Sequence, residues 1–192
     1  MQKRAHALEE TRRQIVWATM QLHAEKGVAT TSQADIASRA GVSPATVYRH
    51  FPTLGSLVRA CGKEVWMAVN PPRPEDAGRL YAGLDTTLER MQRFVEEISD
   101  FYSRALVALD SARQERSRVP ELDEDLRWVE AGLGALAREA LAREGMVESK
   151  VGLMLALTDF GVWKSLRDHG ISEDEAPKIL ATLLQCMVLG QE

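Results

Sequence analysis

The sequence predicts an all-α protein in which a small N-terminal three-helix domain is joined to a larger helical bundle. Helix-forming residues dominate, and no segment alternates apolar and polar residues for long enough to form a sheet. The 192 residues have the composition of a globular protein, with 45% hydrophobic and 27% charged residues. Three prolines within residues 70–74 interrupt any helix. We therefore expect one domain over residues 1–53, a connecting helix at 54–69, and a second domain over 70–192.

Four helices are expected before the prolines, and each has a start or stop signal. Their ranges are about 8–26, 33–40, 44–50 and 54–69. Ser32 is a plausible N-cap of the second helix with Asp35 as its capping-box partner, and Gly41 ends that helix. Ser43 at the N-cap and Pro44 at the first helical position start the third helix.

Five longer helices are expected after the prolines. Their ranges are about 76–98, 99–116, 121–144, 149–169 and 173–190. Gly145 and Gly170 separate the last three, and Ser172 with Glu175 forms a second capping box. Pro177 indicates that the last helix begins a few residues after 173.

Several classes of protein are excluded by the sequence. No apolar run reaches the roughly 18 residues that a membrane span requires, and the charged N-terminus lacks a secretory signal. We therefore expect a cytoplasmic protein that does not contact the membrane. Cys61 and Cys186 have no metal-binding or redox spacing, and the four histidines are scattered. Because catalytic and phosphate-binding motifs are also absent, we predict no enzyme activity, no metal and no cofactor.

Charge is unevenly distributed along the chain. Residues 1–63 contain nine Lys or Arg and four acidic residues, a net charge of +5, whereas the remainder has 15 basic and 24 acidic residues, a net charge of −9. A basic N-terminal third suits contact with a polyanion while the acidic remainder stays clear of it.

Residues 31–51 have the pattern of a helix-turn-helix, in which two short helices are joined by a turn that contains glycine. The apolar residues expected to form its small core are Ile36, Ala37, Ala40, Val42 and Val47. The residues expected to face outward from the second helix are Pro44, Ala45, Thr46, Tyr48, Arg49 and His50. The alternative is a helical hairpin within a bundle, but a helix this short cannot bury Tyr, Arg and His together.

The outward-facing side chains have the chemistry of a DNA-binding surface. Those able to hydrogen-bond phosphate oxygens are Thr46, Tyr48 and His50. The N–H groups at the start of helix 33–40 form an anion site. Arg49 can engage guanine or phosphate, and Pro44 and Ala45 offer apolar contact to a thymine methyl.

The stretch DIASRAGVSPATVYRHFP from Asp35 to Pro52 resembles the DNA-binding signature of the TetR/AcrR family, and the residues AEKG at 24–27 resemble the end of that family's first helix. The resemblance covers about residues 12–60. It implies a transcriptional regulator that binds a double-stranded DNA operator. The DNA-contact positions that it implies are Thr31, Ser32, Gln33, Ser43, Thr46, Tyr48 and His50.

Two residues depart from the family's pattern. Leu54 occupies the position of a lysine that commonly touches phosphate, which predicts weaker affinity for the DNA backbone. His23 occupies the position of a buried aromatic residue. We interpret His23 as a half-buried packing residue, with a pH-sensitive first helix as the alternative.

The last two expected helices are apolar on more than one face and must therefore bury more than one face. The resemblance implies that they and their symmetry mates form a four-helix interface in a homodimer. The candidate interface residues are Leu157, Phe160, Trp163, Leu180, Leu183, Leu184 and Met187. The alternative is that these helices form only the core of their own domain.

Aromatic and methionine residues suggest where an effector could bind. The candidate lining residues are Trp66, Met67, Met91, Phe94, Ile98, Phe101, Tyr102 and Trp128. Such a lining would suit a small apolar or aromatic effector, although most residues of these types simply form core. We predict a repressor that an effector of this kind releases from a palindromic operator. The alternatives are a regulator of the same fold that is controlled by a protein partner, or an activator.

Overall fold

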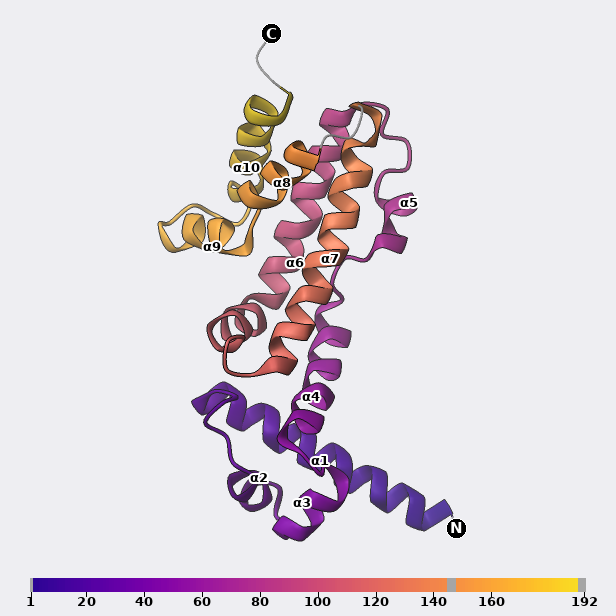
Figure 1. Cartoon of the computed structure of the whole chain (residues 1–192), viewed down its shortest axis with the longest axis vertical. Helices are drawn as coiled ribbons and strands as arrows, with labels where there is room; N and C mark the ends of the chain where they lie inside the picture. Colours follow the sequence, from indigo (N-terminus) through magenta and orange to yellow (C-terminus); the bar gives the residue numbers. More distant parts are fainter. Residues whose placement is uncertain (1, 145–147, 190–192) are drawn as a thin grey trace. The chain divides into compact units, whose positions relative to one another are not determined.

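The computed structural model describes residues 2–144 and 148–189, which form helices and connecting segments without any strand (Figure 1). The α-helices are α1 (Gln2–Lys26), α2 (Gln33–Ala40), α3 (Pro44–His50), α4 (Leu54–Val69), α5 (Ala77–Leu80), α6 (Thr87–Glu115), α7 (Pro120–Leu141), α8 (Glu148–Leu157), α9 (Phe160–Asp168) and α10 (Ala176–Leu184). The additional turns are 3-10 helices at Pro74–Asp76 and Ala142–Glu144 and a π-helix at Gln185–Leu189. The all-α fold class is confirmed. None of the described helices is both long and apolar enough to cross a membrane.

Contacts between residues divide the chain into two compact units. The first unit contains Met1–Ala68 together with Asp110–Leu126, and the second contains Val69–Leu109 together with Arg127–Glu192. The segment 110–126, which joins α6 to α7, therefore packs with the N-terminal helices, although the sequence analysis placed it in the second domain. The domain boundaries at 53 and 70 stay a prediction.

The first unit is built around one hydrophobic core. Its buried side chains, contributed by α1 to α4 and the segment between α3 and α4, are Ile15, Val16, Ala18, Leu22, Ile36, Ala37, Ala40, Val47, Phe51, Leu57 and Cys61. Val42 packs against this core from the turn between α2 and α3. Arg12 of α1 lies over the ring of Phe51, 4.8 Å from its centroid, in cation–π geometry. The core predicted for the helix-turn-helix is thus present, and it is continuous with α1 and α4.

The ends of α2 and α3 follow the predicted local signals. The Ser32 hydroxyl accepts a hydrogen bond from the backbone N–H of Asp35, and the Asp35 carboxylate accepts from the N–H of Ser32. Gly41 ends α2 in the left-handed conformation, at φ 64°. Ser43 caps α3 through the N–H of Thr46, with Pro44 at the first helical position. These short helices therefore have the residue ranges predicted for them.

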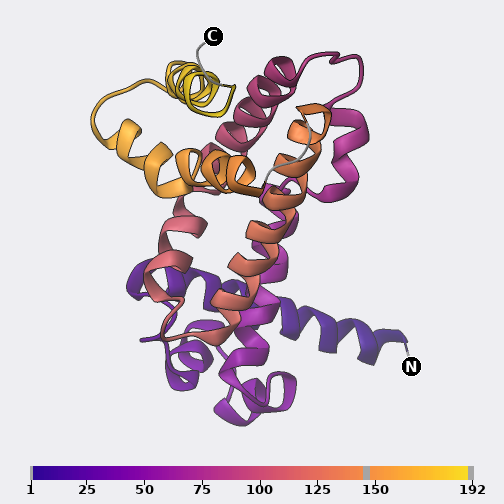
Figure 2. The same cartoon turned by 45° about the horizontal axis from the view of Figure 1, so that its top comes forward.

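The second unit contains residues 87–109 of α6 alongside residues 127–141 of α7, with α8, α9 and α10 near one another (Figure 1 and Figure 2). Its core contains an aromatic cluster in which Tyr102 lies 5.4 Å from Phe160 and 5.8 Å from Trp163 between ring centroids. The Tyr102 hydroxyl donates to the carbonyl oxygen of Thr158 at 3.0 Å. The cluster thus attaches α6 to the α8–α9 corner.

Three predicted helix boundaries in the second unit are wrong. The helix expected at 76–98 is interrupted at residues 81–86, between α5 and α6. Helices were expected at 76–98 and 99–116, but α6 runs unbroken through Ser99 because its buried stripe of apolar residues continues on both sides. The helix expected at 149–169 is instead interrupted after α8. There Asp159 accepts a hydrogen bond from the N–H of Gly161 at 2.7 Å and so starts α9. The last helix begins at Ala176, a few residues after 173 as predicted.

Candidate nucleic-acid interface

Helix α3 presents a short polar surface that its own fold keeps outward. Val47 is completely buried, and this fixes which side of the helix packs against α2. Pro44, Ala45 and Arg49 are exposed, and Tyr48 exposes 61% of its surface. An exposed Tyr beside an exposed Arg provides a hydroxyl donor and a guanidinium fork, the groups that bind phosphates and guanine edges.

The remaining predicted contacts of α3 are partly used within the protein. The hydroxyls of Ser43 and Thr46 lie 2.9 Å apart and share a hydrogen bond, so the hydroxyl that accepts this bond keeps its own proton for a ligand. His50 is half-buried, and its Nε2 is buried without a hydrogen-bond partner among the described residues. Only the remainder of the His50 ring is therefore available to phosphate.

The start of α2 differs from a simple anion site. Thr31 is buried, and its hydroxyl donates to the carbonyl oxygen of Gly27 at 2.7 Å. We therefore assign the Thr31 side chain to the turn and not to DNA. The Asp35 carboxylate already occupies the N–H of Ser32, so a phosphate would have to bind at the N–H groups of residues 33 and 34. Gln33 is half-exposed at this end of the helix.

Two ion pairs join the end of α1 to α2. Lys26 Nζ lies 2.6 Å from Asp35 Oδ2, and Arg39 makes a two-fold contact with Glu25 at 2.7 and 2.8 Å. The hydrogen bond from Lys26 and those from Ser32 lower the pKa of Asp35 well below its ordinary value. The Arg39 guanidinium lowers the pKa of Glu25 in the same way. Both carboxylates therefore stay charged at neutral pH and orient α2 on α1.

The segment 110–126 also contributes carboxylates to the first unit. Gly55 and Gly62 of α4 face α7, and a Cβ atom at these positions would lie 1.8 Å from Glu121 Oε1 and 2.5 Å from Asp125 Oδ2. Burial raises the pKa of Asp125. Glu115 accepts hydrogen bonds from the turn between α1 and α2. The seven-residue spacing of the two glycines could have indicated the close helix contact, whereas no local pattern marks Glu115.

These acidic residues change the charge balance inferred from the N-terminal third. Residues 64–68 add one acidic residue, and residues 110–126 add three basic and six acidic ones. The first unit therefore carries a net charge of only +1. Any attraction to DNA must come from the local arrangement of basic side chains such as Arg49 and not from the total charge of the unit.

The predicted effector-lining residues do not all share one environment. Those buried in the second unit are Met91, Phe94, Ile98, Phe101 and Tyr102. Trp66 and Met67 belong to the first unit, and Met67 exposes 65% of its surface. Trp128 exposes 51%. Only the buried group on α6 can line an interior effector site within one unit.

The predicted dimer residues also separate into two groups. Four of them are buried within the single chain and so form part of the core of their own domain, the alternative given above. They are Phe160, Trp163, Leu180 and Leu184. Leu157 is half-buried, whereas Leu183 and Met187 expose 44% and 60% of their surfaces. Only the last group offers surface to a second protein molecule.

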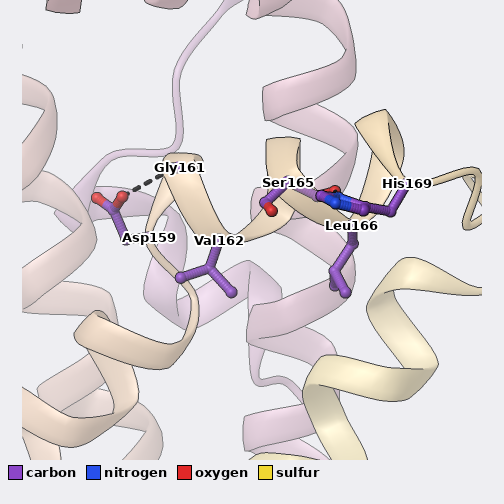
Figure 3. Close-up of a pocket in the computed structure, with 6 residues that line it drawn as sticks. All are labelled: Asp159, Gly161, Val162, Ser165, Leu166 and His169. Atoms are coloured by element: carbon purple, nitrogen blue, oxygen red, sulfur yellow. Dashed lines mark hydrogen bonds between the residues drawn. The ribbon is translucent and has the colours of Figure 1, made fainter.

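An open pocket of about 440 Å³ lies along α9 (Figure 3). Its lining residues are Asp159, Gly161, Val162, Ser165, Leu166 and His169, none of which is among the candidate effector-lining residues predicted from the sequence. Val162 and Leu166 provide its apolar part, and the His169 ring nitrogen Nδ1 lies 2.8 Å from the Ser165 carbonyl oxygen. Within the described part of the chain no group of three or more His, Cys, Asp or Glu side chains could hold a metal ion.

Comparisons with known proteins agree with this geometry. Residues 15–61 match the family model described as bacterial regulatory proteins, tetR family. No curated protein matches the chain at a significant level. Among solved structures, a Rhodococcus sp. protein assigned to the TetR family of transcriptional regulators superposes with a TM-score of 0.64 at 18% identity, covering 93% of this chain and 99% of that one.

Two further solved structures were determined with small molecules. The multidrug binding protein EbrR complexed with imidazole has a TM-score of 0.62 and 21% identity, covering 91% of this chain and 89% of that one. The regulator FadR from Bacillus subtilis in complex with stearoyl-CoA has a TM-score of 0.58 and 16% identity, covering 94% and 99%. At these identities the likeness establishes a shared fold. Residues 15–61 therefore contain the N-terminal helix-turn-helix domain of the TetR family of bacterial regulatory proteins, and the chain has the fold of solved structures assigned to that family.

Proposed function

We propose that the protein is a repressor that binds a palindromic operator as a homodimer and is released by a small apolar or aromatic effector. The observation that carries the DNA-binding part is α3, whose buried Val47 and capping Ser43 hold an exposed Tyr48 and Arg49 outward. A helix of this kind beside a second short helix is the arrangement that enters the major groove.

The proposed contacts follow from exposure and chemistry. Arg49 engages a guanine edge or a phosphate, and the Tyr48 hydroxyl engages a phosphate. Pro44 and Ala45 are exposed and can contact a thymine methyl. Five further residues are proposed to contact DNA through the polar groups that hydrogen bonds within the protein leave available. They are Ser32, Gln33, Ser43, Thr46 and His50. Thr31 supports them by holding the turn.

The homodimer is proposed because one helix-turn-helix covers only one half-site, whereas two recognition helices about 34–36 Å apart read a palindrome. Surface for such an interface exists on the second unit, where Leu183 and Met187 are exposed and Val162 borders the pocket of Figure 3. Exposed apolar side chains on these helices suit an interface that excludes water.

The proposed effector would bind in the second unit near the buried aromatic and methionine residues of α6. Met91, Phe94 and Phe101 would form an apolar lining. Helix α6 starts in the second unit and ends in the first. A ligand that prefers one position of α6 would shift the population toward protein that binds DNA weakly, and DNA must weaken ligand binding by the same factor.

The test is fluorescence anisotropy of the full chain with labelled DNA from upstream of its own gene, titrated with salt. We expect saturable binding to one palindromic fragment and about a tenfold weaker Kd for Arg49→Ala, the order of one lost charged contact. Arg93→Ala is the matched control, because Arg93 is exposed on α6 in the second unit. If Arg49 touches phosphate, the slope of log K against log salt also falls by about 0.9.

Two outcomes would contradict parts of this proposal. Equal binding by wild type and Arg49→Ala would remove Arg49 from the interface.

A search with apolar and aromatic compounds follows, using melting temperature and operator release together as the readout. Compounds that raise the melting temperature without releasing DNA would contradict the repressor mechanism, since release requires different affinities for the two states.

A further inference from the structure

Glu115 is a buried carboxylate at the last residue of α6, and both of its oxygens bind the turn between α1 and α2. Oε1 accepts a hydrogen bond from the N–H of Val28 at 2.9 Å, and Oε2 accepts from the N–H of Ala29 at 2.7 Å. The residue exposes only 8% of its surface. Because a buried charge is costly unless it is hydrogen-bonded, these two charge-assisted bonds hold the carboxylate and the turn together.

The turn is shaped to receive this carboxylate. Gly27 has φ 88°, a conformation that favours glycine, and a Cβ atom there would lie 3.0 Å from Glu115 Oε1. Any other residue at 27 would therefore be strained in its backbone and would crowd the carboxylate. The glycine that ends α1 thus supplies both the turn and the space for Glu115.

The turn leads directly to the start of α2. After Val28 and Ala29, the N–H of Thr31 donates to the Val28 carbonyl at 3.2 Å and its hydroxyl donates to Gly27. The next residue is Ser32, the N-cap of α2. Hydrogen bonds from Glu115 to the turn and within the turn, followed by the peptide bond from Thr31 to Ser32, therefore link the end of α6 to the start of α2.

We propose that Glu115 is a positioning residue for DNA recognition, in which its carboxylate fixes the α1–α2 turn and so sets where α2 begins. This inference rests on the proposed DNA-binding function. Glu115 does not touch DNA; it acts through Ser32 and Gln33. Because Glu115 terminates α6, a displacement of that helix would pull on the turn through these two bonds.

The experiment compares Glu115→Gln and Glu115→Asp with wild type in the full chain. The Gln side chain keeps the shape but has no charge and faces one backbone N–H with an NH2 group, whereas Asp keeps the charge but is one methylene shorter. Glu124→Gln is the matched control, because Glu124 is an exposed carboxylate of the same unit. Amide hydrogen exchange at Val28 and Ala29 and operator affinity are both measured well below the melting temperature.

For Glu115→Gln we expect at least tenfold faster exchange at the two turn amides, with protection in α3 retained. We also expect about a tenfold weaker operator Kd with an unchanged salt slope, because no phosphate contact is lost. Glu115→Asp should lie between wild type and Gln, and Glu124→Gln should match wild type. If Glu115→Gln loses exchange protection throughout the first unit, the unit has unfolded. The milder change, Glu115→Asp, then tests the positioning role.

Three results would overturn the inference. Unchanged exchange at Val28 and Ala29 would show that the carboxylate does not hold the turn. Faster exchange with unchanged operator affinity would show that the two bonds serve stability only. A wild-type chain that binds no DNA would instead reject the proposed function and the positioning role with it, while the exchange data would still report on the bonds themselves.

Discussion

The helix-turn-helix at residues 33–50 and the C-terminal helices α8 to α10 are both made of short helices, but they differ in how far along the chain their stabilising contacts reach. In the helix-turn-helix each end has a local signal: a capping box at Ser32, a left-handed Gly41, and a cap with proline at Ser43. In α8 to α10 the aromatic cluster around Trp163 depends on Tyr102, more than fifty residues earlier in the chain. The ends of α2 and α3 therefore depend on residues a few positions apart, whereas the packing of α8 to α10 depends on a side chain far away in the chain.

The largest expected effect concerns the core of the second unit. Trp163→Ala should lower its free energy of unfolding by about 3–5 kcal/mol, because Trp163 is 1% exposed and its removal leaves a large cavity. Denaturant unfolding followed by circular dichroism measures this. A variant with wild-type stability that no longer dimerises would place Trp163 at the interface and contradict the separation drawn between core and surface residues.

The next prediction distinguishes residues of the proposed dimer interface from residues of the domain core. Leu183→Lys should weaken self-association about tenfold or more while leaving the unfolding of the protomer close to wild type, because Leu183 is 44% exposed on α10. Sedimentation velocity at several concentrations measures the association. Gln185→Lys adds the same charge at an exposed neighbouring position and serves as the control. An unchanged dimer in Leu183→Lys would remove this face from the proposed interface.

A pair of glycines tests how far the helix-turn-helix depends on local conformation. Gly41→Ala should destabilise by about 1 kcal/mol, because φ is 64° and a Cβ atom meets nothing within 4 Å, leaving only the backbone cost. Gly78→Ala in α5 also meets nothing within 4 Å but has no positive φ, so it should stabilise by about 0.5 kcal/mol. Thermal unfolding compares the two. Equal effects would show that the left-handed turn contributes little.

The smallest effect is a pH dependence of the first unit. Burial lowers the pKa of His23 below 6.5, although the charge of Glu115 opposes this. Below pH 6.5 the unfolded chain therefore binds a proton that the folded chain does not, so stability should fall as the pH drops from 7.5 towards 5.5. Denaturant titrations across that range measure it, with His23→Gln expected to flatten this contribution. A slope of the opposite sign would favour a protonated His23 stabilised by Glu115.

Much of the candidate interface was predictable because its signals lie within a few residues of one another. The ranges of α2, α3 and α4 and the core residues Ile36 and Val47 follow from caps, glycines, prolines and apolar spacing. The burial of the Thr31 hydroxyl was not predictable, since it depends on the path of the turn through Gly27. The break between α8 and α9 was missed because Asp159 reads equally well as a solvated helix residue.

The sequence by itself determined the all-α class, the helix-turn-helix, and the side chains that α3 turns outward, because hydrogen bonds and caps between near neighbours suffice for these. The tertiary structure alone decided that residues 110–126 join the first unit, that Glu115 binds the α1–α2 turn, and that Phe160, Trp163, Leu180 and Leu184 are core. These features depend on residues far apart in the chain meeting in space. Their physical basis is the burial of apolar area and the pairing of buried charge, neither of which a local pattern encodes.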